Sequence, residues 1–212
     1  LKKRSIMKKD QFNIGDTKDF NHLIWDEKNR KTILNTPIFD LIEIERESKD
    51  NIKGSFYTLD CPNWVTIIPW YVNEDNIPCF VMVQQFRHGS ATIVREFPAG
   101  MVDKGELAID SAYRELKEET ALSAQEMVFL AQINPNPAIM ENKAYFFLAK
   151  NVFKISNSQN LDITEQLDVL SIPVAQVIEK MGNDPLYDNG VMLMALSLFL
   201  KQAQIDPTLI NS

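Results

Sequence analysis

Three features of the 212-residue sequence predict an α/β fold. Apolar and polar side chains alternate at residues 42–45, as they do in a half-buried strand. In residues 107–120, apolar side chains instead recur three and four positions apart, which is the spacing of an amphipathic helix. The apolar run 191–200 has about ten residues, too few to cross a bilayer, so it indicates a buried helix. The prediction is a strand-rich first half, followed by mixed helices and strands.

Individual strands are predicted where β-branched and aromatic residues gather between turns. The turn 73–76 joins two of these strands into a predicted hairpin. Pro173 suits the first turn of a helix, because its φ is fixed and its missing N–H needs no partner there. We place a domain boundary near residue 60, between a β-rich segment, 1–60, and a mixed α/β domain, 61–212. The predicted strands are 39–45, 52–59, 64–72, 79–86, 92–97, 127–133, 144–149 and 168–172, and the predicted helices are 107–120, 173–181 and 186–202.

Composition argues against several classes of partner and location. The net charge of −7 and the pI of about 4.9 disfavour broad nucleic-acid binding, which needs many Lys and Arg. A small phosphate-bearing substrate remains compatible, since one or two arginines and a divalent cation can hold it. The basic start has no apolar stretch behind it, so we expect no secretory signal and no membrane partner, and Met7 is a candidate start. Because the only cysteines are Cys61 and Cys79, we expect a reduced, cytoplasmic protein.

The segment 114–122, RELKEETAL, places three glutamates on a predicted helix. Glu115 lies three positions before Glu118 and four before Glu119, so the three carboxylates converge on one side of the helix. Close like charges repel each other, and a divalent cation such as Mg²⁺ would offset the repulsion by binding their oxygens. The alternative is a solvated helix face on which the glutamates pair with neighbouring basic residues.

The stretch upstream of these glutamates favours the metal site. Residues 100–122 resemble the Nudix box, G-x5-E-x7-R-E-U-x-E-E-x-G-U, in which U is a bulky aliphatic residue. The one departure is Ala121, where the family has glycine. Because glycine takes a positive φ at a helix end at little cost, we expect alanine to change how the helix ends and to leave the glutamates in place. The matching positions are Gly100, Glu106, Arg114, Glu115, Leu116, Glu118, Glu119 and Leu122.

The resemblance implies a hydrolase that cleaves a nucleoside diphosphate linked to another group, by water attack on phosphorus. The implied cofactor is Mg²⁺, with Mn²⁺ as an alternative, because metal ions neutralise the pyrophosphate and activate the water. The residues implied to carry these roles are Glu115 and Glu119 as main metal ligands, Glu118 as an assisting ligand, Glu118 and Glu119 as catalytic carboxylates, and the Ala99 carbonyl as a further ligand. The implied supporting residues are Gly100, Glu106 and Arg114, of which the last two can instead simply hold the loop against the helix.

Similarity beyond the box, over about residues 35–200, is to the ADP-ribose pyrophosphatase branch of the family. The stretches 81–87, VMVQQFR, and 95–100, REFPAG, carry this similarity. In that branch the arginine matching Arg87 contacts a substrate phosphate, a role that suits the forked guanidinium. A surface ion pair is the alternative for Arg87. Arg95 can bind substrate in the same way or form a structural pair.

One position departs from that branch and concerns the general base. Ungapped alignment places Asn142 where ADP-ribose pyrophosphatases carry a glutamate base. An amide cannot accept a proton as a base, so we assign this catalytic role to the preceding residue, Glu141. A glutamate of the box, or a different substrate, is the alternative.

The combined prediction is an α/β/α Nudix sandwich, with 61–212 as the catalytic domain and 1–60 as a dimerisation arm. The resemblance implies a homodimer that hydrolyses ADP-ribose, or a related nucleoside diphosphate sugar, to a nucleoside monophosphate and a sugar phosphate. The rival function is a non-catalytic Nudix-fold module that binds or senses a nucleotide. One of Trp25, Trp64 and Trp70 can stack on an adenine, with core or interface packing as the alternative for each.

Overall fold

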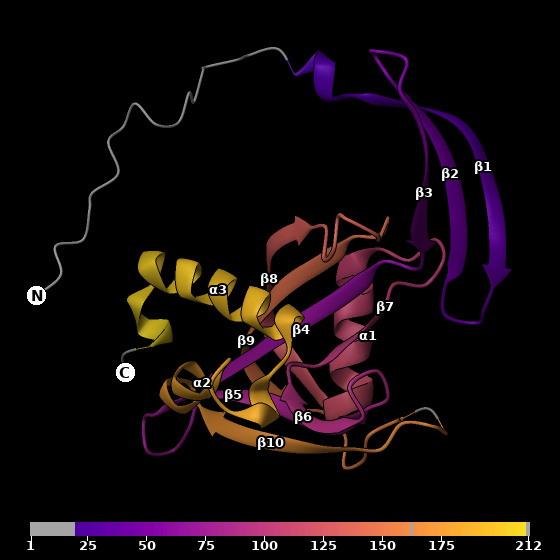
Figure 1. Cartoon of the computed structure of the whole chain (residues 1–212). Helices are drawn as coiled ribbons and strands as arrows, with labels where there is room; N and C mark the ends of the chain where they lie inside the picture. Colours follow the sequence, from indigo (N-terminus) through magenta and orange to yellow (C-terminus); the bar gives the residue numbers. More distant parts are fainter. Residues whose placement is uncertain (1–19, 162, 211–212) are drawn as a thin grey trace, which may run out of the picture.

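A computed structural model describes residues 20–161 and 163–210, so the candidate start, Met7, lies outside the described residues. Within the described part, the strands form two separate sheets, and the chain passes from one to the other between Asp60 and Trp64. Figure 1 shows the smaller sheet standing away from a larger α/β body. The glutamates of the box belong to the larger body.

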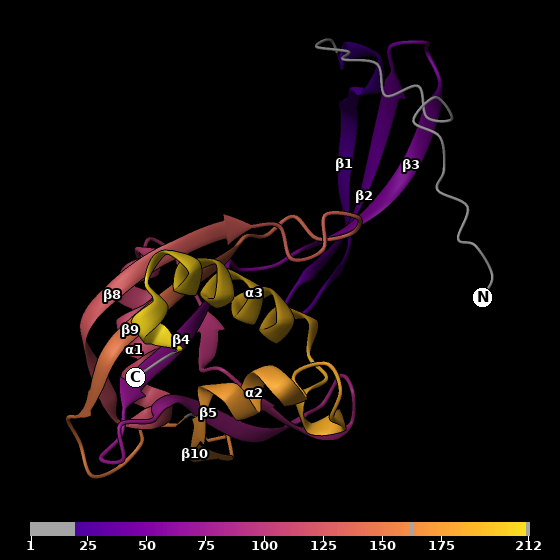
Figure 2. The same ribbon diagram turned by 90° about the vertical axis from the view of Figure 1, so that its left-hand side faces the viewer.

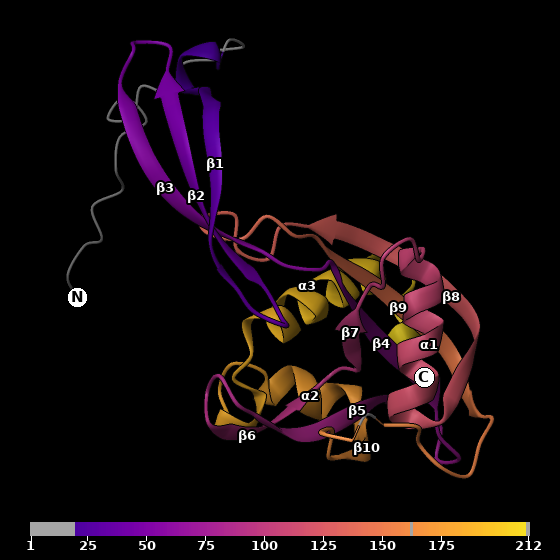
Figure 3. The ribbon, with the colours of Figure 1, turned by 90° about the vertical axis from the view of Figure 1, so that its right-hand side faces the viewer.

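The smaller sheet, here called the arm, is antiparallel and has the order β1-β2-β3. Its strands are β1 (Trp25–Asn35), β2 (Asp40–Ser48) and β3 (Lys53–Asp60). The sequence pattern predicts β2 and β3 but not β1, because charged and polar residues fill the first half of β1 without a period-2 alternation. Figures 2 and 3 show that the arm extends clear of the larger sheet.

The larger sheet is mixed and has the path β10-β5-β4-β9-β8, with β6 beside β5 and β7 beside β4. In the described structure β4 and β9 run parallel, and the other neighbouring strands pair antiparallel. The short β7 was not predicted, because three residues around Gly100 are too few to show an alternation. The strands are β4 (Trp64–Val72), β5 (Pro78–Arg87), β6 (Thr92–Glu96), β7 (Ala99–Met101), β8 (Leu122–Ile133), β9 (Ala144–Lys154) and β10 (Leu167–Pro173).

Helices cover both faces of the larger sheet, which confirms the predicted α/β/α fold (Figure 3). On one face, the helix α1 (Ala108–Thr120) buries Ala112 and Leu116 against a compact apolar cluster. On the other face, α2 (Val174–Lys180) and α3 (Gly190–Ile205) pack on a larger apolar core. The buried stripe of α1 fixes its rotation, so its glutamates lie at the rim of the sheet.

The helices on the second face start differently from the prediction. The side chains of Asp184 and Asn189 each accept backbone N–H groups, so Pro185–Tyr187 forms a separate 3-10 turn and α3 begins at Gly190. Pro173 ends β10 and precedes α2 instead of occupying its first turn. None of the described helices is both long enough and apolar enough to cross a membrane.

The helix α1 ends as a glycine would end it. Ala121 takes a left-handed conformation, with φ 58° and ψ 24°, and its N–H donates to the carbonyl of Lys117. The expectation of a different helix end is therefore wrong. The left-handed backbone costs an alanine about 1–2 kcal/mol, and burial of its methyl group offsets part of that cost. The Ala121 carbonyl also accepts the N–H of Ile155, which holds the turn in place.

Candidate active site

Arg114 is the centre of a polar network that joins α1 to the loop before it. Its guanidinium donates to both oxygens of Glu106, to Glu115, to Glu118 and to the Met101 carbonyl, over 2.7–3.2 Å. Hydrogen bonding to Glu106 is the main cause that raises the pKa of Arg114. The network fixes the positions of two box glutamates relative to β7.

Glu106 ties the loop to the first turn of α1. Besides the contacts with Arg114, it accepts the hydroxyl of Ser111 and, at 3.1 Å, the backbone N–H of Asp103. Hydrogen bonding from Arg114, helped by these two donors, lowers the pKa of Glu106 to about 2. The structure thus places Glu106 and Arg114 where they hold the loop against the helix.

The low pKa of Glu106 predicts a loss of folding stability in acid. Its ordinary pKa is 4.5 and its folded pKa is about 2, so the stabilisation is complete above the first value and is lost as the pH falls toward the second. We expect the free energy of unfolding, measured with urea at about pH 6 and about pH 3, to fall less in Glu106→Gln than in the parent protein. An equal fall in both proteins would contradict this assignment.

The carboxylate of Glu115 lies directly against the backbone of Gly100. A Cβ atom at residue 100 would stand 2.1 Å from both Cδ and Oε1 of Glu115, which is far inside any tolerable contact. Only glycine fits at position 100, because the carboxylate of Glu115 occupies the space that a side chain would need. Burial raises the pKa of Glu115 and outweighs the opposing effect of its hydrogen bond from Arg114.

Glu119 is the most buried of the three box glutamates, with 4% of its surface exposed. Its carboxylate accepts the backbone N–H of Ala99 at 3.2 Å. Burial, and after it the charge of Glu115, raises the pKa of Glu119 well above its usual range. Among the described residues, no side chain donates a hydrogen bond to the carboxylate of Glu119, and Arg114 bonds only to Glu115 of this pair. The pKa values of both carboxylates therefore stay raised despite the nearby charges of Arg114 and Arg87.

These carboxylates fit a divalent cation. Their donor atoms are oxygens, which Mg²⁺ and Mn²⁺ prefer, and a positive charge beside Glu115 and Glu119 would offset the burial of both. Within residues 20–161 and 163–210, no three acidic, His or Cys side chains already stand together as a metal cluster. Glu118 bonds to the same nitrogen of Arg114 as Glu115 does, at 3.2 Å, and lines the same cavity, which suits the assisting role implied for it. The residues that would hold the metal are Glu115, Glu119 and the adjoining Ala99 on β7.

Arg87 reaches the same region from the end of β5. Its Nε donates at 2.6 Å to Oε1 of Glu96, which is completely buried. Gln85 and Asn189 also donate to this carboxylate. The Arg87 side chain is still 45% exposed, and it lines a cavity together with Glu115. The ion pair considered above as the alternative role of Arg87 is therefore present, formed with Glu96. It holds the Arg87 side chain beside the cavity.

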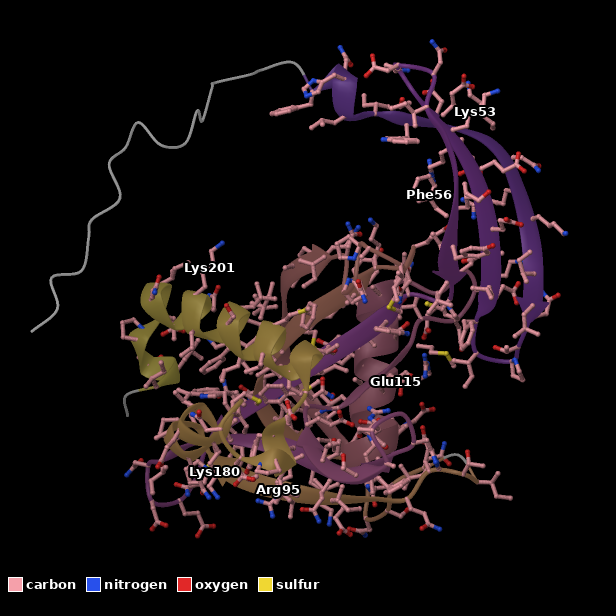
Figure 4. All side chains as sticks on the ribbon, in the orientation of Figure 1. Lys53, Phe56, Arg95, Glu115, Lys180 and Lys201 are labelled. Carbon is pink, nitrogen blue, oxygen red and sulfur yellow. The ribbon has the colours of Figure 1, made fainter. Side chains whose placement is uncertain are left out.

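Arg95 points elsewhere and uses its guanidinium within the fold. Its Nε donates to Gln84 at 2.9 Å, and a terminal nitrogen donates to the Tyr187 hydroxyl at 3.3 Å. The guanidinium also lies 5.8 Å from the centre of the Tyr187 ring. Arg95 does not line the cavity that contains Glu115, and Figure 4 shows the two residues on different parts of the body. Its contacts are those of the structural alternative.

The loop between β8 and β9 carries Glu141 to the arm. The Glu141 carboxylate accepts two hydrogen bonds from Arg30, at 3.0 and 3.1 Å, and one from the Thr58 hydroxyl at 2.6 Å. The next residue, Asn142, is buried and donates to the Pro62 carbonyl, while its Oδ1 has no partner among the described residues. The structure therefore does not bring Glu141 to the box glutamates.

Glu165 is a candidate that sequence analysis missed. It lies in the loop between β9 and β10 and lines a cavity of about 450 Å³ with Arg87, Glu115 and Glu118. Its charge contributes to the raised pKa values of Glu115 and Glu119. No local sequence pattern indicates Glu165, because β8 and β9 separate it from the box along the chain. Only the fold brings Glu165 and the box glutamates together. The sole hint was an acidic side chain in a polar loop before a strand.

An α/β/α sandwich with buried carboxylates and a braced arginine at one cavity is typical of enzymes that act on phosphate compounds. Comparison with known proteins makes this more specific. The NUDIX domain family model matches residues 64–188, which is more than half of the chain. The chain belongs to the Nudix family, so the prediction of a Nudix hydrolase is confirmed.

Similar proteins support the predicted branch. The methanol dehydrogenase activator of Bacillus methanolicus is 29% identical over 142 residues, which are 67% of this chain and 75% of that protein. The ADP-ribose pyrophosphatase of Bacillus subtilis (strain 168) is 28% identical over 123 residues, 58% of this chain and 66% of that protein. The ADP compounds hydrolase NudE of Escherichia coli (strain K12) is 21% identical over 170 residues, 80% and 88% of the two chains. These matches confirm the resemblance to the ADP-ribose pyrophosphatase branch.

One solved structure shows the same fold. A crystal structure of an ADP compounds hydrolase has a TM-score of 0.74 to this chain at 20% identity. The superposition covers 87% of this chain and 96% of the other.

Proposed function

We propose that this protein is a metal-dependent pyrophosphohydrolase. Its substrate is ADP-ribose or a related nucleoside diphosphate sugar, and its products are a nucleoside monophosphate and a sugar phosphate. The observation that carries the proposal is the buried pair of Glu115 and Glu119, of which Glu115 lies against the Gly100 backbone, next to a cavity that Arg87 also lines. Two similar proteins are named for ADP-ribose or ADP compounds, which supports the choice of substrate.

The chain's own groups bind and orient the diphosphate. A divalent cation held by Glu115, Glu119 and the Ala99 carbonyl would supply charge neutralisation and an activated water. Arg87, braced by the buried Glu96, binds a substrate phosphate with the rest of its guanidinium. This bracing limits the motion of a long side chain, so less conformational freedom is lost on binding.

We propose Glu165, instead of Glu141, as the group that accepts the proton of the attacking water. The proposal is supported by position: Glu165 lines the cavity with Glu115, whereas Glu141 does not line it and lies against Arg30 and Thr58 of the arm. Glu165→Gln is expected to lower kcat by at least about 10²-fold, because an amide cannot take the proton. Glu141→Gln, the matched control, is expected to change kcat little. The reverse order of effects would return the role to Glu141.

A substrate panel tests the proposed function. The protein is incubated with ADP-ribose, ADP-glucose, GDP-mannose and NADH, with Mg²⁺, with Mn²⁺ and with EDTA, and the products are separated by chromatography. We expect at least one compound to yield a nucleoside monophosphate with metal and none to do so with EDTA. If no compound is cleaved with either metal, the proposed pyrophosphohydrolase activity is excluded. Equilibrium binding of the same four compounds then tests the rival function, a nucleotide-binding module.

We further propose a cytoplasmic homodimer formed through the arm. Trp25 and Phe56 pack edge to face on one side of the arm, with ring centres 5.5 Å apart, and Phe56 is 43% exposed. Phe56 lies on the inner side of the curved sheet (Figure 4). A small sheet with exposed aromatic side chains gains stability when a partner covers it. Light scattering is expected to give a dimer mass for the parent and for Tyr57→Lys, on the opposite side, and a monomer mass for Phe56→Lys. A monomeric parent would exclude the dimer.

A further inference from the structure

The end of α1 lies beside the start of the loop between β9 and β10. The register of β8 and β9 places Leu122 opposite Lys154, so the chain leaves β9 next to the residue that ends the helix, Ala121. The Ala121 carbonyl accepts the N–H groups of Ile155 at 3.0 Å and of Ser156 at 3.4 Å. The loop therefore begins directly on the C-terminal end of α1.

The next part of the loop bonds to the backbone of two box glutamates. The N–H of Asn160 donates to the carbonyl of Glu118 at 2.9 Å, and the side-chain amide of Gln159 donates to the carbonyl of Glu119. The last carbonyls of a helix have no partner within the helix, so they need donors from elsewhere. Here the loop supplies them. The residues whose carboxylates lie at the proposed metal site are thus held to the loop through their backbone.

A short turn shapes the loop for this contact. The hydroxyl of Ser156 donates to the Ser158 carbonyl at 2.9 Å and accepts the N–H of the same residue at 3.3 Å. Gln159, which follows this turn, is half-buried, whereas its two neighbours, Ser158 and Asn160, are exposed. The Gln159 side chain therefore points inward, toward the helix to which it is bonded.

The same loop carries Glu165 to the cavity. Both Asn160 and Glu165 line the cavity beside the box glutamates. After burial, which is the main cause, the charge of Glu165 adds to the raised pKa values of Glu115 and Glu119. The loop thus meets α1 in two ways, by bonds to the helix end and by a carboxylate that faces the same cavity. Because Glu165 lies only six positions after Gln159, a shift of the bonded part would also move this carboxylate.

We infer that Gln159 is a positioning residue for the reaction, an inference that rests on the proposed function. Its amide links the backbone of Glu119, a proposed metal ligand, to the loop that presents Glu165, the proposed base. Gln159 does not line the cavity, so it acts through Glu165. A base has to lie within hydrogen-bond reach of the water whose proton it takes, and a displacement of about 1 Å costs on the order of 10²-fold in rate. The bond of Gln159 therefore affects kcat and not substrate affinity.

Gln159→Met tests this role, because methionine has about the length of glutamine and has no N–H to donate. We expect kcat for a compound cleaved in the substrate panel to fall at least about tenfold, with little change in KM or in the Mg²⁺ concentration that gives half-maximal rate. Gln159→Lys is expected to recover most of the loss, since an ammonium group can donate to a carbonyl at a helix C-terminus. Gln125→Met is the matched control, because Gln125 is exposed on β8, and it is expected to behave like the parent.

A double-mutant cycle with Glu165→Gln separates positioning from a general loss of stability. If Gln159 acts through Glu165, Gln159→Met lowers kcat in the parent protein and adds little when residue 165 is already glutamine. Its effect on the melting temperature is expected to be the same in both backgrounds. An unchanged kcat in Gln159→Met, an equal fall of kcat in both backgrounds, or no recovery in Gln159→Lys would overturn the inference.

Amide hydrogen exchange tests the contact between loop and helix without turnover. The N–H of Asn160, which is bonded to the Glu118 carbonyl, is expected to exchange faster in Gln159→Met than in the parent or in Gln125→Met. Equal exchange in all three proteins would show that Gln159 does not hold the loop, and would overturn the inference whether or not a substrate is cleaved. Failure of the substrate panel would overturn the proposed function, whereas a cleaved substrate with the parent kcat in Gln159→Met would overturn the role of Gln159 alone.

Discussion

Glu119→Gln is expected to lower turnover by at least about 10²-fold, because it removes a buried carboxylate from the proposed metal site. The same change is expected to keep or raise folding stability. Burial raises the pKa of Glu119, so the folded state prefers its neutral form, and its contribution to stability falls as the pH rises above the ordinary glutamate value. Glutamine resembles the neutral form at every pH. We expect the melting temperature of the variant near pH 8 to equal or exceed that of the parent.

Glu126→Gln is the matched control, since Glu126 is exposed on β8 and the substitution is the same. It is expected to leave both turnover and melting temperature near the parent values. Two results would contradict the role of Glu119. Full activity would show that it is not a ligand, and a large loss of stability would show that its charge is needed for folding.

Gly100→Ala is expected to reduce activity to a similar degree without a change in any ionisable group. The new Cβ atom would fall 2.1 Å from the Glu115 carboxylate, so either the carboxylate or β7 has to move. Displacement of a ligand by about 1 Å costs on the order of 10²-fold in rate. We expect a lower kcat and weaker activation by Mg²⁺, measured as the metal concentration that gives half-maximal rate.

Gly190→Ala is the control for this change, because an added Cβ at residue 190 meets nothing within 4 Å. It is expected to behave like the parent in both measurements. Unchanged kinetics in Gly100→Ala would show that the close contact with Glu115 is not used in catalysis.

Much of the site was predictable because helical spacing is local. Glu115, Glu118 and Glu119 were expected on one side of a helix, and the structure places all three on α1. Arg114 was expected as a supporting residue, and its guanidinium bonds to both Glu115 and Glu118. The strand β4 has the predicted bounds, since a buried run of apolar residues needs no distant information to be recognised.

The parts that could not be predicted depend on contacts between distant segments. Arg95 lies in a stretch that is similar to the ADP-ribose pyrophosphatase branch. Its guanidinium nevertheless donates a hydrogen bond to Tyr187, ninety-two residues away. Glu141 is the acidic residue nearest in sequence to position 142, where a glutamate base was expected. Its carboxylate is instead bonded to Arg30 of the arm. Asn142, at the expected position, is buried with an unpaired oxygen.

The α/β class, the Nudix box and the gathering of its glutamates on one helix can be predicted without a structure, because they follow from spacing within single elements. The set of groups that meet at the cavity depends instead on how distant segments pack. This packing brings in Glu165 from a loop beyond β9 and braces Arg87 with Glu96. It also lets Ala121 adopt the backbone of the family's glycine, because burial of the methyl group compensates part of the strain. Each of these outcomes depends on packing between segments that spacing along the chain does not describe.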